Sequence, residues 1–467
     1  MKLVRGFYNP KYYLMHRKIS KVDSSQAQKI ASSLSVITLK SYTKKILIKQ
    51  TFIIMSDSLP LLARQPIFDP QMKVIGYELL CRSSHINKAT FTNGDIASSQ
   101  VLLNAFTELS IEKVVGKHLA FVNFTRNLLL SPPPFDRRQL VIEVLEGQRV
   151  DAEMLHSLKV LREQQYTIAL DDFILTPETQ HLIPYADIIK LDVLQLPSKQ
   201  LQEHINHIRP FGIQLLAEKV ETYEMLEFCK KAGFDLFQGY FLAHPQIMTG
   251  RKMSDNKQSV LQLMSALHDP NVQVETIEKM IARDTVLSFK LLLLVNSAAF
   301  GAMRKVDSLK QAILLLGINK IRNWVNILVM SNLSGKPHEL SVAALTRARM
   351  CEMIANQLND KVKPDAYFTV GLLSTIDAFM DAPLQSLLND ISLSQHINEA
   401  ILDQRGEEGK VLEITKHYEK GEWEQIDWDF LQQHNINPER LTKIYLETLS
   451  WVESTMKELG IYENIKS

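Results

Sequence analysis

Between Leu61 and about Pro245 the chain alternates short apolar runs with amphipathic segments. Short apolar runs bounded by turn residues are typical of strands, whereas Asp151–Gln164 and Tyr223–Ala232 have the period of helices. Strands that alternate with helices predict parallel βα units, arranged either as an α/β TIM-like barrel or as a doubly wound sheet. The seven expected strands are Val74–Leu80, Ala120–Asn123, Leu140–Val144, Tyr166–Leu170, Ile188–Leu191, Ile213–Ala217 and Asp235–Tyr240.

After a polar stretch at Pro245–Lys257 the pattern becomes almost wholly helical. We therefore expect a barrel domain over 55–250 and an all-α domain over 251–467. Asp284 and Ser308 are expected N-caps, and Gly317 is an expected helix end. The expected helices are Ser259–Leu267, Val274–Ala282, Ser288–Asn296, Ser308–Leu316, Ile318–Met330, Val342–Leu358, Ala366–Phe379, Leu393–Leu402, Trp428–Gln433 and Pro438–Leu459.

The composition is that of a globular chain, and its charge is unevenly distributed. The 467 residues are 45% hydrophobic and 22% charged, which excludes a disordered or fibrous protein. Residues 1–54 contain eleven Lys or Arg and one Asp, a formal charge of +10, so the other 413 residues carry −9 of the overall +1. An acidic folded body argues against a nucleic acid polymer as the main partner.

The basic segment 1–54 has three interpretations. The first is that Met55 is the true start and the segment is not native. The others are a basic arm for a membrane surface or nucleic acid, and a targeting peptide. Three scattered cysteines exclude a disulfide framework and indicate a reducing, cytoplasmic compartment. No apolar run reaches the ~18 residues of a transmembrane helix.

Polar side chains recur at the ends of nearly all the expected strands. In a parallel barrel the carboxyl ends of the strands open on one face, where these side chains converge. Any one of them also has a simpler interpretation as a helix cap, and Asp172 and Glu221 stay ambiguous in this respect. The recurring residues are Glu78, Asn123, Glu143, Asp171, Asp172, Lys190, Asp192, Glu218 and Gln238.

Several carboxylates on one face repel each other unless cations neutralise them. Carboxylate and amide oxygens favour Mg²⁺ or Mn²⁺. Two such ions beside a lysine suit phosphodiester hydrolysis, because one activates water and both stabilise the developing charge. The sequence therefore predicts a two-metal site at the strand ends.

These residues lie in motifs that resemble, in order, those of the EAL domain, over about Leu61–Pro245. The resemblance implies a modified TIM barrel that hydrolyses cyclic di-GMP to the linear dinucleotide. The motifs are Gly76-Tyr-Glu-Leu-Leu-Cys-Arg82, Phe121-Val-Asn-Phe124, Ile142-Glu-Val-Leu-Glu146, Ala169-Leu-Asp-Asp-Phe173, Lys190-Leu-Asp192, Ala217-Glu-Lys-Val-Glu221 and Gln238-Gly-Tyr240.

The resemblance also implies a role for each residue. Lys190 positions or activates water, Glu218 belongs to the catalytic group, and Glu221 supports the metal loop. Arg82 contacts a substrate phosphate, Leu80 belongs to the substrate-binding group, and Gln238 orders the site beside the substrate. The implied ligands of two Mg²⁺ or Mn²⁺ ions are Glu78, Asn123, Glu143, Asp171, Asp172 and Glu218.

Two departures from the family pattern stand out. The name-giving triplet reads Glu78-Leu79-Leu80, with Leu in place of Ala. Active members usually follow Asp-Asp-Phe with a Gly-rich loop that supports metal ligands and homodimer formation, and Ile174–Glu178 stands there instead. Because Ile and Leu do not adopt positive φ cheaply, we expect this loop to take another path.

The helical half resembles the HDOD domain over about Lys257–Trp451. The motifs are Ile281-Ala-Arg-Asp-Thr-Val-Leu-Ser-Phe-Lys-Leu-Leu292, Val295-Asn-Ser-Ala-Ala-Phe-Gly301, Ser308-Leu-Lys-Gln-Ala-Ile313 and Leu316-Gly317. Ser374 and Thr375 stand where a related HD-type hydrolase places its His-Asp pair, and two hydroxyls do not replace those metal ligands. The resemblance implies a module that binds protein partners.

Two hypotheses for the function follow. The first is an enzyme, a metal-dependent cyclic di-GMP phosphodiesterase regulated by the helical domain. The second is a weak or inactive barrel that acts as a cyclic di-GMP receptor or as an adaptor. The intact acidic set favours the first, and the altered loop with the absent His-Asp pair favours the second.

Overall fold

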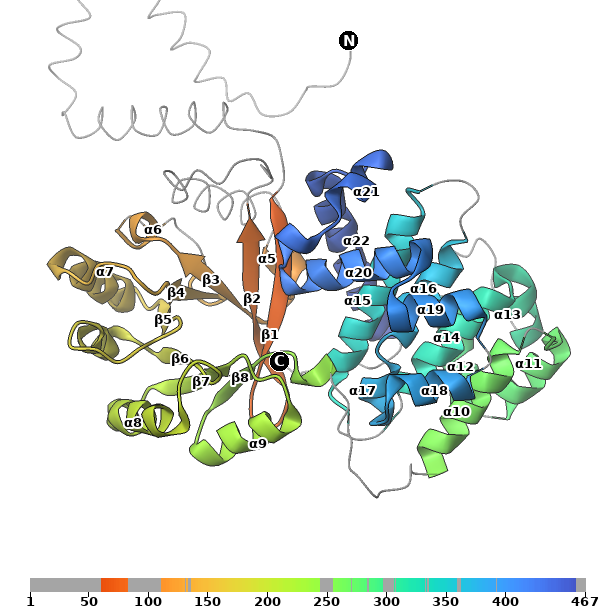
Figure 1. Cartoon of the computed structure of the whole chain (residues 1–467), viewed down its shortest axis with the longest axis horizontal. Helices are drawn as coiled ribbons and strands as arrows, with labels where there is room; N and C mark the ends of the chain where they lie inside the picture. Colours follow the sequence, from red (N-terminus) through yellow and green to blue (C-terminus); the bar gives the residue numbers. More distant parts are fainter. Residues whose placement is uncertain are drawn as a thin grey trace, which may run out of the picture. The chain divides into compact units, whose positions relative to one another are not determined.

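A closed eight-stranded barrel forms the first half of the chain (Figure 1). The computed structural model describes residues 60–82, 111–130, 132, 136–243, 255–269, 271–283, 285–296, 306, 308–331, 333, 336–358, 363–391 and 393–458. Of the two predicted arrangements, the barrel is confirmed and the doubly wound sheet is not observed. The basic segment 1–54 lies outside the described residues. The strands are β1 Leu61–Phe68, β2 Val74–Arg82, β3 Leu119–Phe124, β4 Leu140–Val144, β5 Thr167–Leu170, β6 Ile188–Asp192, β7 Gln214–Glu218 and β8 Leu236–Gln238.

Strand β1 is not among the seven expected strands, and it runs antiparallel to both neighbours, β2 and β8. The other adjacent pairs, from β2 to β8, are parallel as expected. The expectation of seven strands is therefore wrong by one. The apolar run of β1 is broken by Arg64, Gln65 and Pro66, and a proline inside a run argues against a strand.

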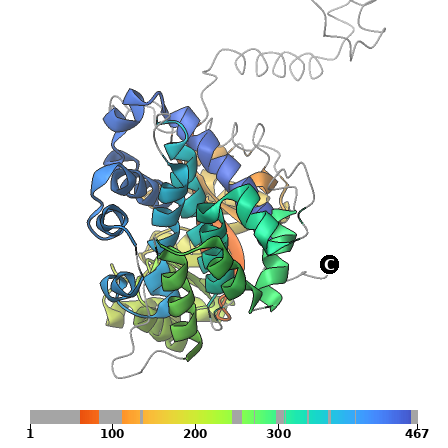
Figure 2. The same cartoon turned by 90° about the vertical axis from the view of Figure 1, so that its right-hand side faces the viewer.

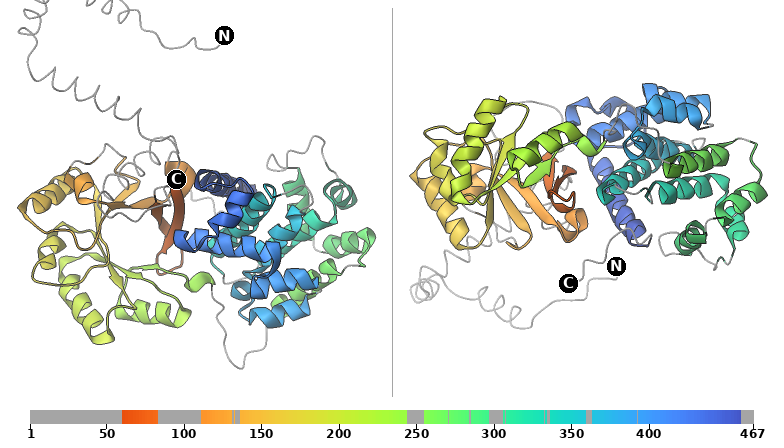
Figure 3. Two further views of the ribbon diagram at one scale, coloured as in Figure 1. Left: turned by 45° about the horizontal axis from the view of Figure 1, so that its top comes forward. Right: turned by 90° about the horizontal axis from the view of Figure 1, so that it is seen from below.

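Helices of the barrel follow its strands, and the first turns of α7 and α9 are capped by side chains. Asp151 accepts a hydrogen bond from the Met154 amide at 3.0 Å to start α7. Thr222 does the same for α9 through the Met225 amide at 3.2 Å. Figure 3 shows these helices around the strands. Their bounds are α5 Ile111–Val115, α6 Arg126–Leu130, α7 Ala152–Glu163, α8 Ser198–Ile208 and α9 Tyr223–Ala232, with 3-10 turns at Thr179–Tyr185, Arg209–Phe211 and Phe241–Ala243.

The second half is helical throughout its described residues (Figure 2). As predicted, Ser308 caps α13 through the Gln311 amide at 3.2 Å and Gly317 ends it; Asp284 lies outside the described residues. Helices α18 and α20 are unexpected, and α20 contains two glycines of low helix propensity. The bounds are α10 Asp255–His268, α11 Val274–Ala282, α12 Thr285–Val295, α13 Leu309–Leu316, α14 Ile318–Ser331, α15 His338–Ala355, α16 Pro364–Leu373, α17 Ile376–Met380, α18 Leu384–Asp390, α19 Gln395–Asp403, α20 Gly406–Lys420, a 3-10 turn Trp423–Gln425, α21 Trp428–Gln433 and α22 Pro438–Glu458.

Helices α20 and α22 of the second half pack against β1 of the barrel. The Thr442 hydroxyl on α22 donates to the Pro60 carbonyl at 2.9 Å in a buried contact. Leu61 and Leu62 are both fully buried, so the start of β1 is covered on both faces. One cluster of buried apolar side chains runs through both halves. Within the described residues, no helix is long and apolar enough to cross a membrane.

A partly buried carboxyl group lies at this junction. Glu339, at the start of α15, accepts a hydrogen bond from the Tyr77 hydroxyl of β2 at 3.1 Å. The Arg64 guanidinium lies over the Tyr77 ring, 4.1 Å from its centroid. Burial raises the pKa of Glu339 from 4.5 to about 7, although the positive charge of Arg64 lowers it. The folded protein therefore favours the neutral carboxyl group.

We predict that the free energy of unfolding falls as the pH rises from about 4.5 to 7, because the folded state binds the extra proton of Glu339 in that interval. Glu339→Gln should remove this contribution, roughly 1–3 kcal/mol. Urea denaturation of both proteins at pH 5 and pH 7.5 measures the difference. The exposed Glu453→Gln serves as the matched control, and an equal pH dependence in wild type and Glu339→Gln would contradict the prediction.

Candidate functional site

An apolar layer crosses the inside of the barrel. Gly76 stands at this level on β2, where an added Cβ would lie 2.7 Å from the Phe121 ring. Glycine therefore leaves room for that ring. The side chains of the layer, one from each of the other seven strands, are Ile67, Phe121, Val141, Ala169, Ile188, Leu216 and Leu236.

A polar layer follows, because side chains two positions apart on a strand face the same side. Seven of its eight residues lie on strands, one on each of β1 to β4 and β6 to β8. The eighth, Asp171, directly follows β5. On the antiparallel β1 the corresponding residue, Gln65, comes two positions before Ile67 instead of after it. The sequence analysis missed Gln65 because it missed the strand. The eight residues are Gln65, Glu78, Asn123, Glu143, Asp171, Lys190, Glu218 and Gln238.

The ammonium group of Lys190 stands in the middle of four carboxylates of this layer. Its Nζ lies 3.1 Å from Glu78 Oε2, 2.7 Å from Glu143 Oε1, 2.7 Å from Asp171 Oδ1 and 2.9 Å from Glu218 Oε1. The Lys190 side chain is fully buried. The structure thus brings five of the predicted site residues into direct contact.

The four carboxylates differ in their affinity for protons. Burial raises the pKa of Glu143 well above its usual value, raises the pKa of Asp171, and raises the pKa of Glu218 to about 7. Burial would also raise the pKa of Glu78, but Lys190 and hydrogen bonds from Gln238 and Asn123 bring it below the usual value. One ammonium group is therefore too little positive charge to keep all four buried carboxylates ionised.

Two amide side chains hold Glu78 in place. Gln238 Nε2 donates to Glu78 Oε2 at 2.6 Å and to Gln65 Oε1 at 2.9 Å. Asn123 Nδ2 donates to Glu78 Oε1 at 3.4 Å. Gly239 has φ +155, and an added Cβ would lie 2.0 Å from the Val220 carbonyl oxygen. The close approach of these two loops fixes the backbone beside Gln238.

The other predicted residues lie outside this cluster. Asp172 has φ +40, and its Oδ1 is 3.7 Å from Lys219 Nζ. Glu221 is exposed in the loop after β7. Arg82 ends β2 with its side chain 46% exposed and forms an ion pair with Glu424 of the helical half. Leu80 lies beside Gly421, where an added Cβ would be 3.0 Å from Leu80 Cδ1.

The loop Ile174–Glu178 takes a path without positive φ, which agrees with the expectation for a loop that lacks glycine. Thr176 and Thr179 bind each other, with the Thr179 hydroxyl donating to the Ile174 carbonyl at 2.6 Å. The Leu175 amide donates to His204 Nε2 of α8 at 2.9 Å. Hydroxyl and imidazole contacts therefore hold the loop.

The residues fit the predicted Mg²⁺ or Mn²⁺ ions in their chemistry. Within the part of the chain that the structure describes, no three His, Cys, Asp or Glu side chains already form a metal-binding group, and Lys190 stands among the carboxylates instead. Buried oxygens here still lack a hydrogen bond partner, among them Glu143 Oε2, Glu218 Oε2 and Asn123 Oδ1. Such oxygens are the ligands that these ions prefer.

In the helical half, Ser374 and Thr375 form hydrogen bonds at the break between α16 and α17. Ser374 Oγ donates to the Gly371 carbonyl at 2.8 Å and accepts from Arg347 Nη1 at 3.2 Å. Thr375 Oγ1 donates to the Leu372 carbonyl at 2.8 Å. Arg347 also pairs with Glu419 at 2.7 Å. An ion pair and two hydroxyls thus occupy this region.

Two family models match the chain in sequence. The EAL domain model matches residues 95–245, and the HDOD domain model matches residues 255–417. Glu78 and Arg82 precede the EAL match, yet Glu78 stands in the polar layer with the matched residues. The prediction of an EAL-type barrel followed by an HDOD domain is confirmed.

Two curated relatives cover most of the chain. The uncharacterized protein YuxH of Bacillus subtilis is 32% identical over 84% of this chain and 98% of its own length. The cyclic di-GMP phosphodiesterase CdgJ of Vibrio cholerae is 30% identical over 79% of this chain and 87% of its own length. Among solved structures, a standalone EAL protein from Vibrio cholerae O395 in its c-di-GMP bound form is 22% identical, with a TM-score of 0.32 over 40% of this chain and 92% of that chain.

Lys190→Met should destabilise the metal-free protein at neutral pH, because it leaves four buried carboxylates without their ammonium partner. We expect a loss of about 3–5 kcal/mol, the usual cost of breaking a buried ion pair. Thermal unfolding in EDTA measures it. Mn²⁺ should then stabilise the variant more than the wild type.

The matched control is Lys231→Met, since Lys231 is an exposed lysine on α9, away from the polar layer. It should change the free energy of unfolding by less than about 1 kcal/mol. An equal loss in both variants would show that the four-carboxylate contact of Lys190 is not what stabilises the barrel.

Proposed function

Because the chain belongs to the family in which an EAL domain is followed by an HDOD domain, we propose that its barrel hydrolyses cyclic di-GMP to the linear dinucleotide. The observation that carries this proposal is the polar layer, in which one buried lysine faces four carboxylates and the pKa values of three are raised. Such a concentration of acidic oxygens suits cation-assisted phosphodiester chemistry.

The metal ligands in this proposal are Glu78, Asn123, Glu143, Asp171, Asp172 and Glu218. Two Mg²⁺ or Mn²⁺ ions bound by these residues would activate water and stabilise the negative charge that develops on the phosphate.

The chain's own groups prepare this reaction. Lys190 holds the carboxylates toward one point and supplies a positive charge beside the attacking water. Glu218, whose pKa of about 7 lies near physiological pH, is suited to accept a proton. Gln238 fixes the orientation of Glu78, and Arg82 at the end of β2 offers a guanidinium to a substrate phosphate.

The helical half serves as a regulatory and protein-interaction module in this proposal. Its hydroxyls Ser374 and Thr375 are engaged with backbone carbonyls, and its Arg347–Glu419 pair is partly buried. These contacts support a structural role for the region where a related hydrolase carries its His-Asp pair.

The proposal predicts that the purified full-length protein forms the linear dinucleotide from cyclic di-GMP with Mn²⁺ or Mg²⁺. Glu78→Gln and Lys190→Met should each lower kcat by about a hundredfold or more, because both act on the reacting centre. The exposed Glu163→Gln on α7 should keep wild-type activity. Chromatography of the products measures the rates. Wild-type turnover no faster than that of Glu78→Gln would overturn the proposal that the barrel is an enzyme.

The second candidate is a cyclic di-GMP receptor, which the glycine-free loop at Ile174–Glu178 favours. It predicts binding of cyclic di-GMP in the presence of Ca²⁺ together with no turnover in Mn²⁺. Isothermal titration calorimetry measures the binding, and Arg82→Gln should weaken it roughly ten- to a hundredfold by removing a charge-assisted contact. A wild type that neither binds nor cleaves the nucleotide would overturn both candidates and leave an adaptor.

A further inference from the structure

A partly buried arginine of the helical half makes no direct ion pair among the described residues, and the nearby charge of Asp269 is the one that raises its pKa. Arg322 on α14 donates from Nη2 to the Asp269 carbonyl at 3.1 Å and from Nη1 to Asn319 Oδ1 at 3.4 Å. Its Nε is buried without a hydrogen bond partner, and burial lowers its pKa. Its hydrogen bonds go to a backbone carbonyl and an amide oxygen, and the Asp269 carboxylate acts on it only through its charge. Buried charges in proteins are normally paired, so this position calls for an anion.

A cavity of about 220 Å³ opens beside Arg322. It lies between α10, α14, α16 and the start of α19. Lys363, the residue before α16, contributes an exposed second cation, which likewise forms no ion pair within the described residues. Ser394 and His396 contribute a hydroxyl and an imidazole at the start of α19. Two cations therefore line the cavity together with the carboxylate of Asp365, and the Asp269 carboxylate acts on Arg322 from outside the lining.

The remaining wall consists of neutral groups held by hydrogen bonds. His268 Nε2 pairs with Asn326 Nδ2 at 2.9 Å, and burial lowers the pKa of His268 to about 4, so the imidazole is neutral at pH 7. Asn323 donates to the Asp365 carbonyl at 3.2 Å and accepts from the Thr369 hydroxyl at 2.7 Å. The wall is thus fixed before any ligand enters.

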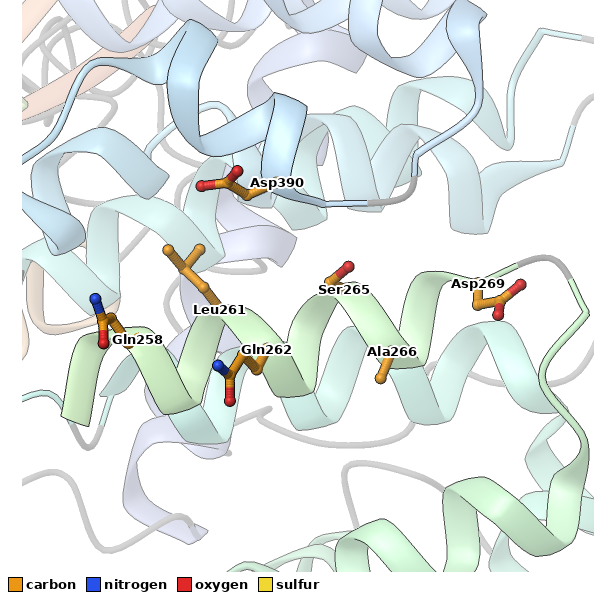
Figure 4. Close-up of a pocket in the computed structure, with 7 residues that line it drawn as sticks. All are labelled: Gln258, Leu261, Gln262, Ser265, Ala266, Asp269 and Asp390. Carbon is orange, nitrogen blue, oxygen red and sulfur yellow. The ribbon is translucent and has the colours of Figure 1, made fainter. Parts of the chain in front are cut away.

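A larger hollow of about 640 Å³ along α10 has the opposite character (Figure 4). Its charged lining residues are two carboxylates, Asp269 at the end of α10 and Asp390 at the end of α18. These charges repel an anion. The cations Arg322 and Lys363 distinguish the smaller cavity from this hollow.

We propose that this cavity binds a small phosphate-bearing ligand, with Arg322 and Lys363 as its charge partners. Its volume of about 220 Å³ is below the ~300–1,000 Å³ of ordinary ligand pockets, which favours a ligand smaller than a cyclic dinucleotide. A phosphate group carries more charge and more acceptor oxygens than a carboxylate, and the guanidinium, ammonium and hydroxyl donors match it. The site is independent of the proposed reaction in the barrel.

Isothermal titration calorimetry of the full-length protein with inorganic phosphate tests the proposal. The buffer contains EDTA, so that metal-bound phosphate in the barrel does not contribute. Arg322→Gln should weaken binding at least tenfold and Lys363→Gln about three- to tenfold, because each removes a charge-assisted contact. Lys279→Gln, an exposed lysine on α11 that does not line the cavity, is the matched control and should bind like the wild type.

A wild type that binds phosphate with a Kd weaker than about 1 mM overturns the proposal. Equal phosphate affinity in the wild type and Lys363→Gln also overturns the proposal. Because Lys363 is exposed, this variant folds normally and gives the test even where Arg322→Gln fails to fold. Succinate serves as the carboxylate probe, and binding as tight as that of phosphate would overturn the phosphate assignment. Phosphate should also shift the imidazole NMR signals of His268 and His396, which a site in the barrel would leave unchanged.

Discussion

The buried ammonium of Lys190 is the contact on which the interior of the barrel depends. Removing an ammonium group from water costs several kcal/mol, and carboxylates at 2.7–3.1 Å on other strands offset this cost. The carboxylates need the lysine equally, since burial alone makes their charged forms unfavourable. One side chain thus contacts carboxylates from four different elements of the barrel.

The polar layer was largely predictable because its signal is local. A polar residue after an apolar strand is visible in one short window, and alternation with period two places Glu143 and Lys190 inside the barrel once the apolar layer is known. Strand β1 and its Gln65 were not predictable from such a window, because Pro66 breaks the apolar run. The contact of Lys190 with all four carboxylates depends on barrel closure, which joins residues more than a hundred positions apart.

In the loop after Asp172, composition predicts the backbone conformation but not the contacts that hold it. The absence of glycine correctly predicted a path without positive φ after Asp172. Two hydrogen bonds hold that path: the hydroxyl of Thr179, directly after the loop, donates to the Ile174 carbonyl, and the Leu175 amide donates to His204 on α8. The threonine pair is local, but His204 lies 29 residues beyond Leu175 and becomes its partner only when α8 packs on the barrel. In this loop a side chain from a distant helix thus fixes the backbone conformation, whereas a glycine-rich loop reaches its conformation through the freedom of its own backbone.

The packing of α20 and α22 on β1 has a genetic consequence. Since one apolar core runs through both halves, a substitution such as Leu441→Ala in α22 lowers the fraction of molecules in which the barrel is folded. A screen for loss of the proposed cyclic di-GMP hydrolysis would therefore recover changes spread over the helical half, far from the polar layer. Such a map would trace the shared core, and second-site suppressors that stabilise this core would fall in either half of the chain.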